Sequence, residues 1–326
     1  MKNRKLGKAG VTVSEIGLGT WQLGSKWGEP FNHDEAMNIL SAAKKNGINF
    51  IDTADVYNNG NSEKVIGEFM KKDIQKPFVV TKCGRQLNPH TAEMYTPEAV
   101  EKYVEESIQR MDVENLDMIL LHCPPTTVYK KSDVFAKLDE LKKVGKIKHY
   151  GVSVEKVEEA IEAMNYDISA IEIIFNMFRL KPAEKLFDLA KEKNIGIIVR
   201  VPLASGLLTG KFNKTTSFGE SDHRSFNRNG EHFDKGETFS GVDYDLGLEA
   251  VQELKKVFGT ENLVPYALKW ILMHDAVSVV IPGASKTSQV ESNIKASELP
   301  ALSKKQMNEV KAIYDKYIKE SVHNNW

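Results

Sequence analysis

The sequence predicts a closed (β/α)8 barrel of the TIM type, an α/β fold. Over 326 residues, eight short runs rich in Ile, Val, Leu and Phe alternate with longer segments of helical periodicity. Such nearly continuous apolar runs are typical of parallel strands covered by helices. A doubly wound dinucleotide-binding sheet is disfavoured, because Gln22 in GLGTWQLG stands where the G-x-G-x-x-G pattern needs its third glycine. We therefore expect one barrel domain over residues 1–326.

The predicted elements follow from these runs and from local start and stop signals. Pro97 and Pro182 stand near helix starts, and KNGI, KKVGKI and KNIGI place Asn or Gly at helix ends just before a strand. The predicted strands are Ile16–Gly19, Ile48–Asp52, Phe78–Thr81, Met118–Leu121, Ile147–Val152, Ile171–Phe175, Ile195–Val199 and Val277–Ile281. The predicted helices are Asp34–Asn46, Ser62–Lys71, Pro97–Met111, Ser132–Val144, Val154–Met164, Pro182–Lys193, Val264–His274 and Thr287–Ala296.

Two regions fall outside this repeated unit. We expect Lys5–Ser14 to form an N-terminal β-hairpin that closes the bottom of the barrel. Asn213–Asp245 is a long polar loop after the seventh strand. Two interpretations of this loop stay open, a lid over the site and a solvated connector without structure.

The composition argues against several classes of partner. Forty-four Lys plus Arg residues balance 45 Asp plus Glu residues, so no overall charge attracts nucleic acid or an anionic membrane. No uninterrupted apolar run reaches the roughly 18 residues that span a bilayer. Cys83 and Cys123 cannot form a disulfide framework, and the first ten residues lack the apolar stretch of a signal peptide, so we expect a cytoplasmic protein. The histidines lack ligand spacing, and we therefore expect no metal site.

Four polar side chains stand at or just after the ends of consecutive predicted strands. Asp52 ends the second strand and Tyr57 lies in the loop behind it, Lys82 follows the third strand, and His122 follows the fourth. Because the carboxyl ends of barrel strands meet at one rim, we expect these groups to converge there.

These four groups are suited to proton delivery. A phenol with a pKa of about 10 is a poor donor near neutral pH, and we expect the Lys82 ammonium to lower the pKa of Tyr57. Asp52 would hold the lysine charged and oriented, and His122 would orient a carbonyl oxygen by a hydrogen bond.

Seven motifs in one order carry a resemblance to a known family. They are GLGTWQLG, FIDTADVY, TKCG, LLHCPP, GVS, VPLASGLLTGKF and IPGASKTSQVESN. With them the chain resembles the aldo-keto reductase superfamily, in particular its microbial long-loop members, over nearly its whole length. The resemblance implies NAD(P)H-dependent reduction of aldehydes or ketones to alcohols, by hydride transfer from nicotinamide and proton donation from Tyr57. It also implies that the catalytic tetrad is Asp52, Tyr57, Lys82 and His122.

At the nicotinamide end the resemblance implies contacts from Thr20, Trp21, Asp52 and Ser153, with Ser153 holding the carboxamide. Here the chain departs from many relatives. It has Val154 and Glu172 where they have Asn and Gln, and Arg200 where they have an aromatic residue that stacks on the ring. A guanidinium is planar and also stacks. We hypothesise that Arg200 lies against the nicotinamide and pairs with Glu172.

The rest of the implied cofactor site lies in two later segments. Leu203, Ser205, Gly206, Leu208 and Lys211 resemble the segment that wraps the pyrophosphate. Ser285, Lys286, Gln289 and Asn293 resemble the adenosine end. Lys286 is the one cation of that set and would meet a 2′-phosphate, so we expect NADPH in preference to NADH.

The expected substrate is a small-molecule carbonyl compound. Trp21, Tyr57, His122 and Cys123 are the candidate pocket residues, and a short C-terminal stretch, Ser303–Trp326, suggests an open site. Which carbonyl compound is reduced, and whether the protein forms oligomers, stay open at this stage.

Two other functions stay open as well. Lys82 would serve as the Schiff-base nucleophile of a barrel lyase. Alternatively, the chain would bind NADPH as a regulatory or channel-associated subunit with vestigial catalysis, as some relatives do.

Overall fold

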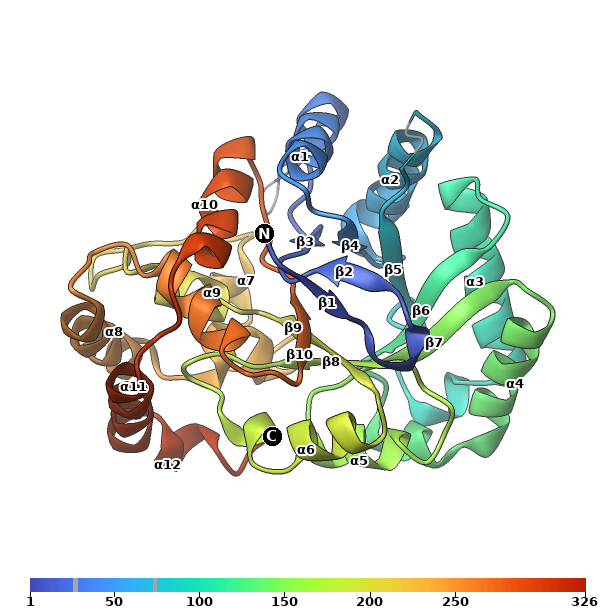
Figure 1. The fold of residues 1–326 in the computed structure, drawn as a ribbon. Coiled ribbons are helices and arrows are strands. Elements are labelled where there is room, and N and C mark those ends of the chain that lie inside the picture. Colours follow the sequence, from blue (N-terminus) through green and yellow to red (C-terminus); the bar gives the residue numbers. More distant parts are fainter. Residues whose placement is uncertain (26–28, 73–74) are drawn as a thin grey trace.

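The computed structural model describes residues 1–25, 29–72 and 75–326. Among these residues, eight strands form one parallel sheet in the order β3 to β10, and parallel bridges from Ile16 to Val280 and from Gly19 to Gly283 close the sheet on itself. The predicted (β/α)8 barrel is confirmed (Figure 1). The strands are β3 (Leu18–Gly19), β4 (Phe50–Asp52), β5 (Phe78–Cys83), β6 (Leu116–His122), β7 (Ile147–Ser153), β8 (Ala170–Ile174), β9 (Gly196–Arg200) and β10 (Val277–Val280).

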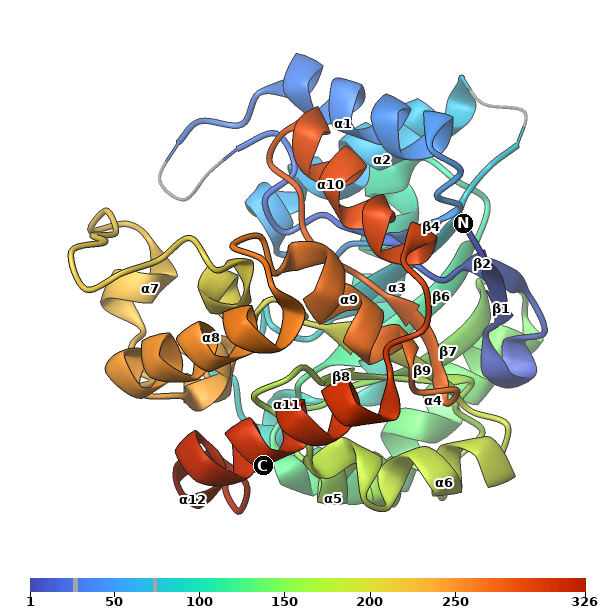
Figure 2. The same ribbon diagram turned by 60° about the vertical axis from the view of Figure 1, so that its left-hand side comes forward.

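Most helices of the described residues cover the outside of the barrel, whereas α7 (His223–Phe226) belongs to the 213–245 segment at one end of it (Figure 2). The others are α1 (His33–Lys45), α2 (Asn61–Lys71), α3 (Pro97–Met111), α4 (Ser132–Lys143), α5 (Val157–Ala163), α6 (Leu186–Glu192), α8 (Tyr244–Phe258), α9 (Val264–Leu272), α10 (Thr287–Glu298), α11 (Lys304–Tyr317) and α12 (Lys319–Val322).

Two predicted helices begin later than expected. The backbone of Val154 donates to Glu172 O at 2.9 Å and so extends the pairing of β7 with β8, which delays α5 until Val157. The predicted helix from Pro182 is divided into a short 3-10 turn and α6, because Lys185 has a non-helical φ of −140°.

The barrel interior is filled by apolar side chains that alternate along the strands. Phe50, Val80, Met118, Leu120 and Ile198 are among the members of this cluster, and each is completely buried. Burying a side chain of this size contributes roughly 1.5–3 kcal/mol, so the centre of the barrel is a packed core. We therefore expect reactive groups at the rim of the barrel, where the strands end.

A hairpin closes one end of the barrel, as predicted. Strands β1 (Asn3–Lys5) and β2 (Thr12–Ser14) pair antiparallel, and Leu6 and Val13 pack into the interior cluster. Between the strands the chain passes so close to β9 that a Cβ on Gly7 would lie 2.2 Å from Gly196 N. Figure 1 shows this hairpin in front of the barrel strands, and Figure 2 shows the hairpin on one side of the barrel and α7 on the other.

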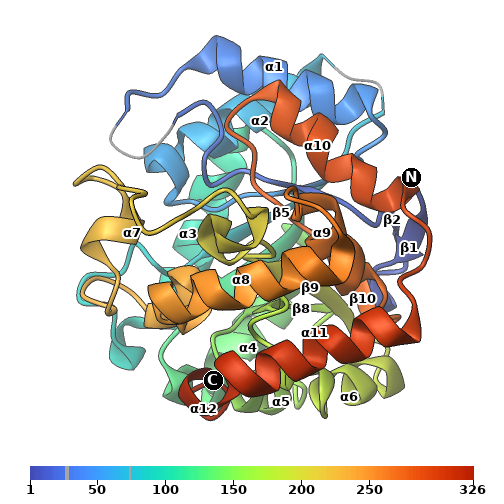
Figure 3. The ribbon, with the colours of Figure 1, turned by 90° about the vertical axis from the view of Figure 1, so that its left-hand side faces the viewer.

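The 213–245 segment is ordered and packed. It carries α7 and two 3-10 turns, η7 (Lys235–Glu237) and η8 (Phe239–Gly241), and Glu237 and Phe239 are buried. An unstructured connector does not describe this segment. The helix that follows it, α8, was not predicted, and it packs beside α11 (Figure 3).

No helix of the described residues combines the length and the apolarity that a membrane crossing requires.

Candidate active site

The four groups predicted to converge come from three neighbouring strands. Asp52 ends β4, Lys82 lies in β5, and His122 ends β6. Tyr57 begins the 3-10 turn η2 (Tyr57–Gly60) behind β4. The structure brings these side chains together at the carboxyl rim of the barrel.

Lys82 is at the centre of the group. Its Nζ donates to Asp52 Oδ1 at 2.6 Å, to Asp52 Oδ2 at 2.7 Å and to the carbonyl oxygen of Thr53 at 3.0 Å. The same Nζ lies 5.2 Å from the centroid of the Tyr57 ring and 3.5 Å from Glu172 Oε2. Although burial opposes the charged form, the Asp52 and Glu172 carboxylates raise the pKa of Lys82, so the lysine stays protonated.

The expected effect of Lys82 on Tyr57 is present but is outweighed. Burial raises the pKa of Tyr57 well above its usual value of 10, with Lys82 lowering it and Asp52 and Glu172 adding to the rise. The expectation that the pKa of Tyr57 is lowered overall was therefore wrong. Burial costs the phenolate more solvation free energy than the charge of Lys82 returns. The hydroxyl consequently stays protonated at neutral pH, which is the form that donates a proton.

His122 stands beside the phenol. Its ring centroid is 6.0 Å from that of Tyr57 in an edge-on arrangement at 78°. Burial lowers the pKa of His122, and the charges of Arg85, Lys82 and Arg200 lower it further, so the imidazole is neutral. Among the described residues its buried Nδ1 has no hydrogen-bond partner, which leaves a polar atom for a ligand.

Ser153 and Glu172 lie together at the neighbouring strand ends. The Ser153 hydroxyl donates to Glu172 Oε1 at 3.2 Å, and Glu172 Oε2 is buried without a hydrogen-bond partner in the described chain. A primary amide has two N–H donors and one acceptor, and these two side chains match it. The residues present therefore fit a nicotinamide carboxamide.

The hypothesised pairing of Arg200 with Glu172 is only the longest of several ion pairs. Arg200 Nη2 donates to Glu155 Oε2 at 2.8 Å and to the carbonyl oxygen of Val154 at 3.0 Å. The distance from Arg200 Nε to Glu172 Oε1 is 4.0 Å. The main partner of Arg200 is thus Glu155, which the sequence reasoning did not single out.

Two further charged residues of the rim were also missed. Arg85, behind β5, donates to Glu237 Oε1 at 2.5 Å, and Arg200 Nη1 lies 3.6 Å from the same oxygen. Although burial works in the opposite direction, Arg85 and Arg200 lower the pKa of Glu237 to about 2. Arg85 stands three residues after Lys82, and that spacing past a strand end is the signal that could have found it. Glu237 lies in the long polar loop, where nothing in the sequence distinguishes it from its neighbours.

The other predicted cofactor residues are placed around the same rim. Thr20 supports β4 by donating from Oγ1 to Asp52 O at 2.8 Å. The Ser205 hydroxyl donates to Glu237 O and accepts from Phe239 N, both at 3.0 Å, so the 213–245 segment is joined to the turn η6 (Ala204–Thr209). Leu203, Ser205 and Gly206 are partly exposed in and beside this turn, Leu208 is buried in it and Lys211 is exposed behind it.

The predicted adenosine residues gather at the start of α10. Gln289 Oε1 accepts from Ser285 N at 2.7 Å, and the buried Asn293 donates to Gly283 O at 3.4 Å. Lys286 is exposed at the N-cap of α10. A helix N-terminus with an adjacent lysine suits a phosphate group.

Of the predicted pocket residues, Trp21 lies beside the 213–245 segment. The centroid of the Trp21 ring lies 5.0 Å from that of His223 and 6.5 Å from that of Phe233. Cys123 is buried directly after His122, and burial raises the pKa of its thiol to about 12. A thiol with this pKa is not a thiolate nucleophile near neutral pH.

Fold and site together define a barrel enzyme whose carboxyl rim presents an acid, an amine, a phenol and an imidazole. The model of the Aldo/keto reductase family matches residues 15–315. The chain belongs to this family and is an oxidoreductase that acts on carbonyl compounds with a nicotinamide cofactor.

Relatives and solved structures resemble nearly the whole chain. The NADH-specific methylglyoxal reductase of Escherichia coli is 29% identical over 91% of this chain and 93% of its own length. An NADP(+) aldo-keto reductase of Schizosaccharomyces pombe is 27% identical over 90% and 86%. A putative voltage-gated potassium channel subunit beta of the same yeast is 30% identical over 90% and 88%. The holo form of an aldo-keto reductase of Bacillus halodurans has a TM-score of 0.78 at 25% identity, and it covers 100% of this chain and 99% of its own.

Proposed function

We propose that the protein reduces an aldehyde or ketone to an alcohol with Tyr57 as the proton donor, and that NADPH is the preferred cofactor. The observation that carries the proposal is the position of Lys82. Its ammonium is held by both oxygens of Asp52 and stands 5.2 Å from the centroid of the Tyr57 ring. A charge fixed in that position stabilises the phenolate that proton donation creates.

Each side chain of the group has a separate task. Tyr57 donates the proton from its hydroxyl to the carbonyl oxygen. Lys82 lowers the free energy of the phenolate, and Asp52 keeps Lys82 charged and in position. The neutral His122 holds the carbonyl oxygen by a hydrogen bond.

The cofactor residues are those that the family resemblance implies, and the donor and acceptor pattern of Ser153 and Glu172 supports the nicotinamide end. Ser153 and Glu172 would hold the nicotinamide carboxamide, and Arg200 would lie against the ring. When bound, the reduced nicotinamide supplies the hydride. We propose that Leu203, Ser205, Gly206, Leu208 and Lys211 wrap the pyrophosphate, and that Ser285, Gln289 and Asn293 hold the adenosine.

Lys286 is the basis for the proposed NADPH preference. It is exposed beside the first turn of α10, where helix and side chain both favour an anion. The relatives named above include an NADH-specific and an NADP(+) enzyme, so the choice must be tested on this chain. We expect Lys286→Ala to weaken NADPH binding on the order of tenfold and to leave NADH binding unchanged.

The decisive experiment compares wild type with Tyr57→Phe. Oxidation of NADPH and of NADH is followed by absorbance with a panel of aldehydes, ketones and oxo acids, and cofactor affinity is measured separately by protein fluorescence. Removing one hydroxyl should lower turnover roughly 10²- to 10⁴-fold while cofactor affinity is retained. Unchanged turnover in Tyr57→Phe would show that another group donates the proton.

A second function is supported by one relative, which is named a channel subunit. If wild type binds NADPH tightly but reduces no carbonyl compound of the panel, the regulatory-subunit proposal replaces the reductase proposal. The Schiff-base proposal is disfavoured, because a lysine whose charge is held by two carboxylates is a poor amine nucleophile.

A further inference from the structure

Two guanidinium groups reach one carboxylate from opposite sides of the barrel rim. Arg85 follows β5 and Arg200 ends β9, and these strands are four positions apart in the eight-stranded order of the described sheet. Both approach Glu237 Oε1, Arg85 at 2.5 Å and Arg200 at 3.6 Å. Glu237 is therefore held at the mouth of the barrel.

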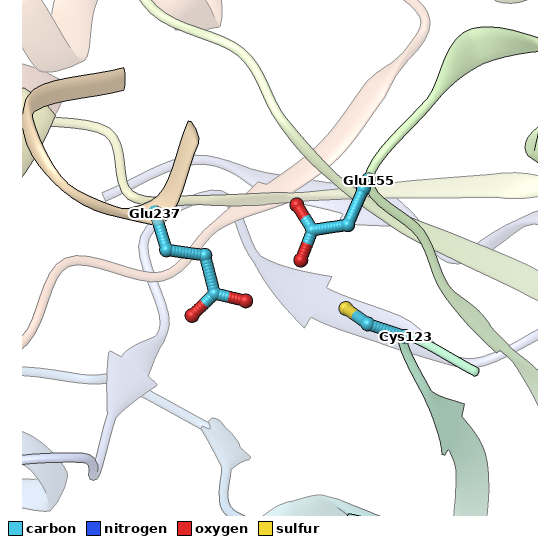
Figure 4. A group of neighbouring side chains, drawn as sticks. All are labelled: Cys123, Glu155 and Glu237. Atoms are coloured by element: carbon cyan, nitrogen blue, oxygen red, sulfur yellow. The ribbon is translucent and has the colours of Figure 1, made fainter. Parts of the chain in front are cut away.

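This carboxylate is not part of the barrel. Glu237 belongs to η7 in the 213–245 segment, whereas Arg85, Arg200 and Glu155 follow or end barrel strands. Figure 4 shows Glu237 entering from its own turn, with its carboxylate in the same space as Glu155 and Cys123. Without Glu237, Arg85 would keep its 3.4 Å contact with Glu155, and Arg200 would keep Glu155 at 2.8 Å and Glu172 at 4.0 Å, the latter being shared with Lys82. Arg85 and Arg200 would thus lose the one carboxylate oxygen that both approach, and that position is filled by an anion from outside the barrel.

The anion position adjoins the group that receives the carbonyl oxygen. Arg200 Nη2 lies 3.5 Å from Cys123 Sγ, and Cys123 directly follows His122. The charges of Arg85 and Arg200 both act on the His122 imidazole. Arg200 Nε also lies 4.0 Å from Glu172 Oε1, and Glu172 Oε2 lies 3.5 Å from Lys82 Nζ. A carbonyl compound bound beside Lys82 and Tyr57 would therefore have its neighbouring atoms on the side of the Arg200 guanidinium.

We propose that Arg85 and Arg200 bind the carboxylate of the substrate, which takes the place of the Glu237 carboxylate, and that the substrate class is carbonyl compounds with a carboxylate close to the carbonyl, such as 2-oxo acids. This inference rests on the proposed reductase function and names its substrate class. Two guanidinium groups suit a planar carboxylate because each offers N–H donors in a fixed fork.

The same carboxylates do not serve as a metal site. One ligand atom from each of Cys123, Glu155 and Glu237 lies within 4.8 Å of the others. Arg85 and Arg200 already hydrogen-bond to these two carboxylates and supply the positive charge that a cation would bring.

The test measures discrimination between an acid and its neutral partner. Phenylglyoxylate is compared with its methyl ester, and succinic semialdehyde with butyraldehyde, for wild type, Arg85→Gln, Arg85→Lys, Glu237→Gln and the control Arg228→Gln. Arg228 is exposed on the same segment. Its substitution removes one positive charge that does not contact Glu155 or Glu237. The measured quantity is the ratio of kcat/KM for the acid to that for the neutral compound.

We expect Arg85→Gln to lower this ratio on the order of 10- to 100-fold, and Glu237→Gln to raise it because a competing carboxylate is removed. Arg85→Lys should keep part of the preference, which separates loss of charge from loss of folding. Arg228→Gln should leave the ratio unchanged. An unchanged ratio in both Arg85→Gln and Glu237→Gln, with neutral carbonyls still reduced, would overturn the inference alone.

A binding measurement separates this inference from the proposed function. Oxamate, an unreactive oxo-acid analogue, and neutral oxamide are titrated calorimetrically into protein saturated with NADPH. Wild type should bind oxamate in preference to oxamide, and Arg85→Gln should lose that preference. Equal binding of oxamate and oxamide by wild type would overturn the inference, whatever the result of the activity assays. Absence of any carbonyl reduction would instead count against the reductase function itself.

Discussion

Trp326 donates a hydrogen bond from its indole Nε1 to Asp234 Oδ1 at 2.8 Å. The same ring lies under the Arg179 guanidinium, 3.9 Å from its carbon to the ring centroid, and fills the space beside Gly236 and Gly241. The C-terminal stretch was expected to leave the site open. Instead it holds the 213–245 segment, which carries Glu237, against the barrel.

We predict that Trp326→Ala loosens this segment. A large buried aromatic side chain is lost, so the free energy of unfolding should fall by about 3 kcal/mol, and limited proteolysis should cut first within residues 213–245. Trp326→Phe is the matched control, because it keeps a ring against Arg179 but loses the hydrogen bond to Asp234 and part of the indole beside Gly241. Equal protease resistance of wild type and Trp326→Ala would show that the segment is held by other contacts.

Asp55 is predicted to make stability depend on pH. Its carboxylate is buried, and among the described residues neither oxygen has a hydrogen-bond partner. Burial, with Glu63, raises the pKa of Asp55 from 3.8 to about 7. Because the pKa in the folded protein is the higher one, the contribution of Asp55 to stability is complete below pH 3.8 and is lost as the pH rises through about 7.

Asp55→Asn removes this ionisation. The stability of the variant relative to wild type should therefore increase by about 2–3 kcal/mol between about pH 5 and about pH 8.5, measured by urea unfolding. Asp133→Asn, at an exposed carboxylate, is the control and should show no such increase. A difference between Asp55→Asn and wild type that does not change with pH would contradict the buried, ionising carboxylate.

The partners of Arg200 give a third prediction. Its hydrogen bond to Glu155 is 2.8 Å long, whereas Glu172 is 4.0 Å away. In double-variant cycles with Arg200→Gln, the interaction free energy should be about 1–2 kcal/mol for Glu155→Gln and smaller for Glu172→Gln. Each cycle is measured twice, once from the free energy of unfolding and once from the affinity for the cofactor. A larger coupling to Glu172 would restore the originally hypothesised pair.

The sequence predicted those parts of the molecule that depend on local pattern. Apolar runs located every barrel strand to within a few residues, and the positions just behind strand ends located Asp52, Lys82 and His122. The pairing of Arg85 with Glu237 could not be read from the chain, because 152 positions separate the two residues and the pair depends on how a long loop folds back. The pKa of Tyr57 was mispredicted for a related reason: the adjacent lysine is visible in the sequence, but the extent of burial is not.

The hairpin at the bottom of the barrel has a consequence for engineering. It fastens the strands on the face opposite the site, through Leu6 and Val13 in the core and through a hydrogen bond of 2.6 Å from Lys8 N to Asn194 O. The hairpin thus stabilises the barrel from the face that does not carry the site. New loops can be grafted onto the rim to change what the protein recognises, while the residues that keep the barrel shut are left untouched.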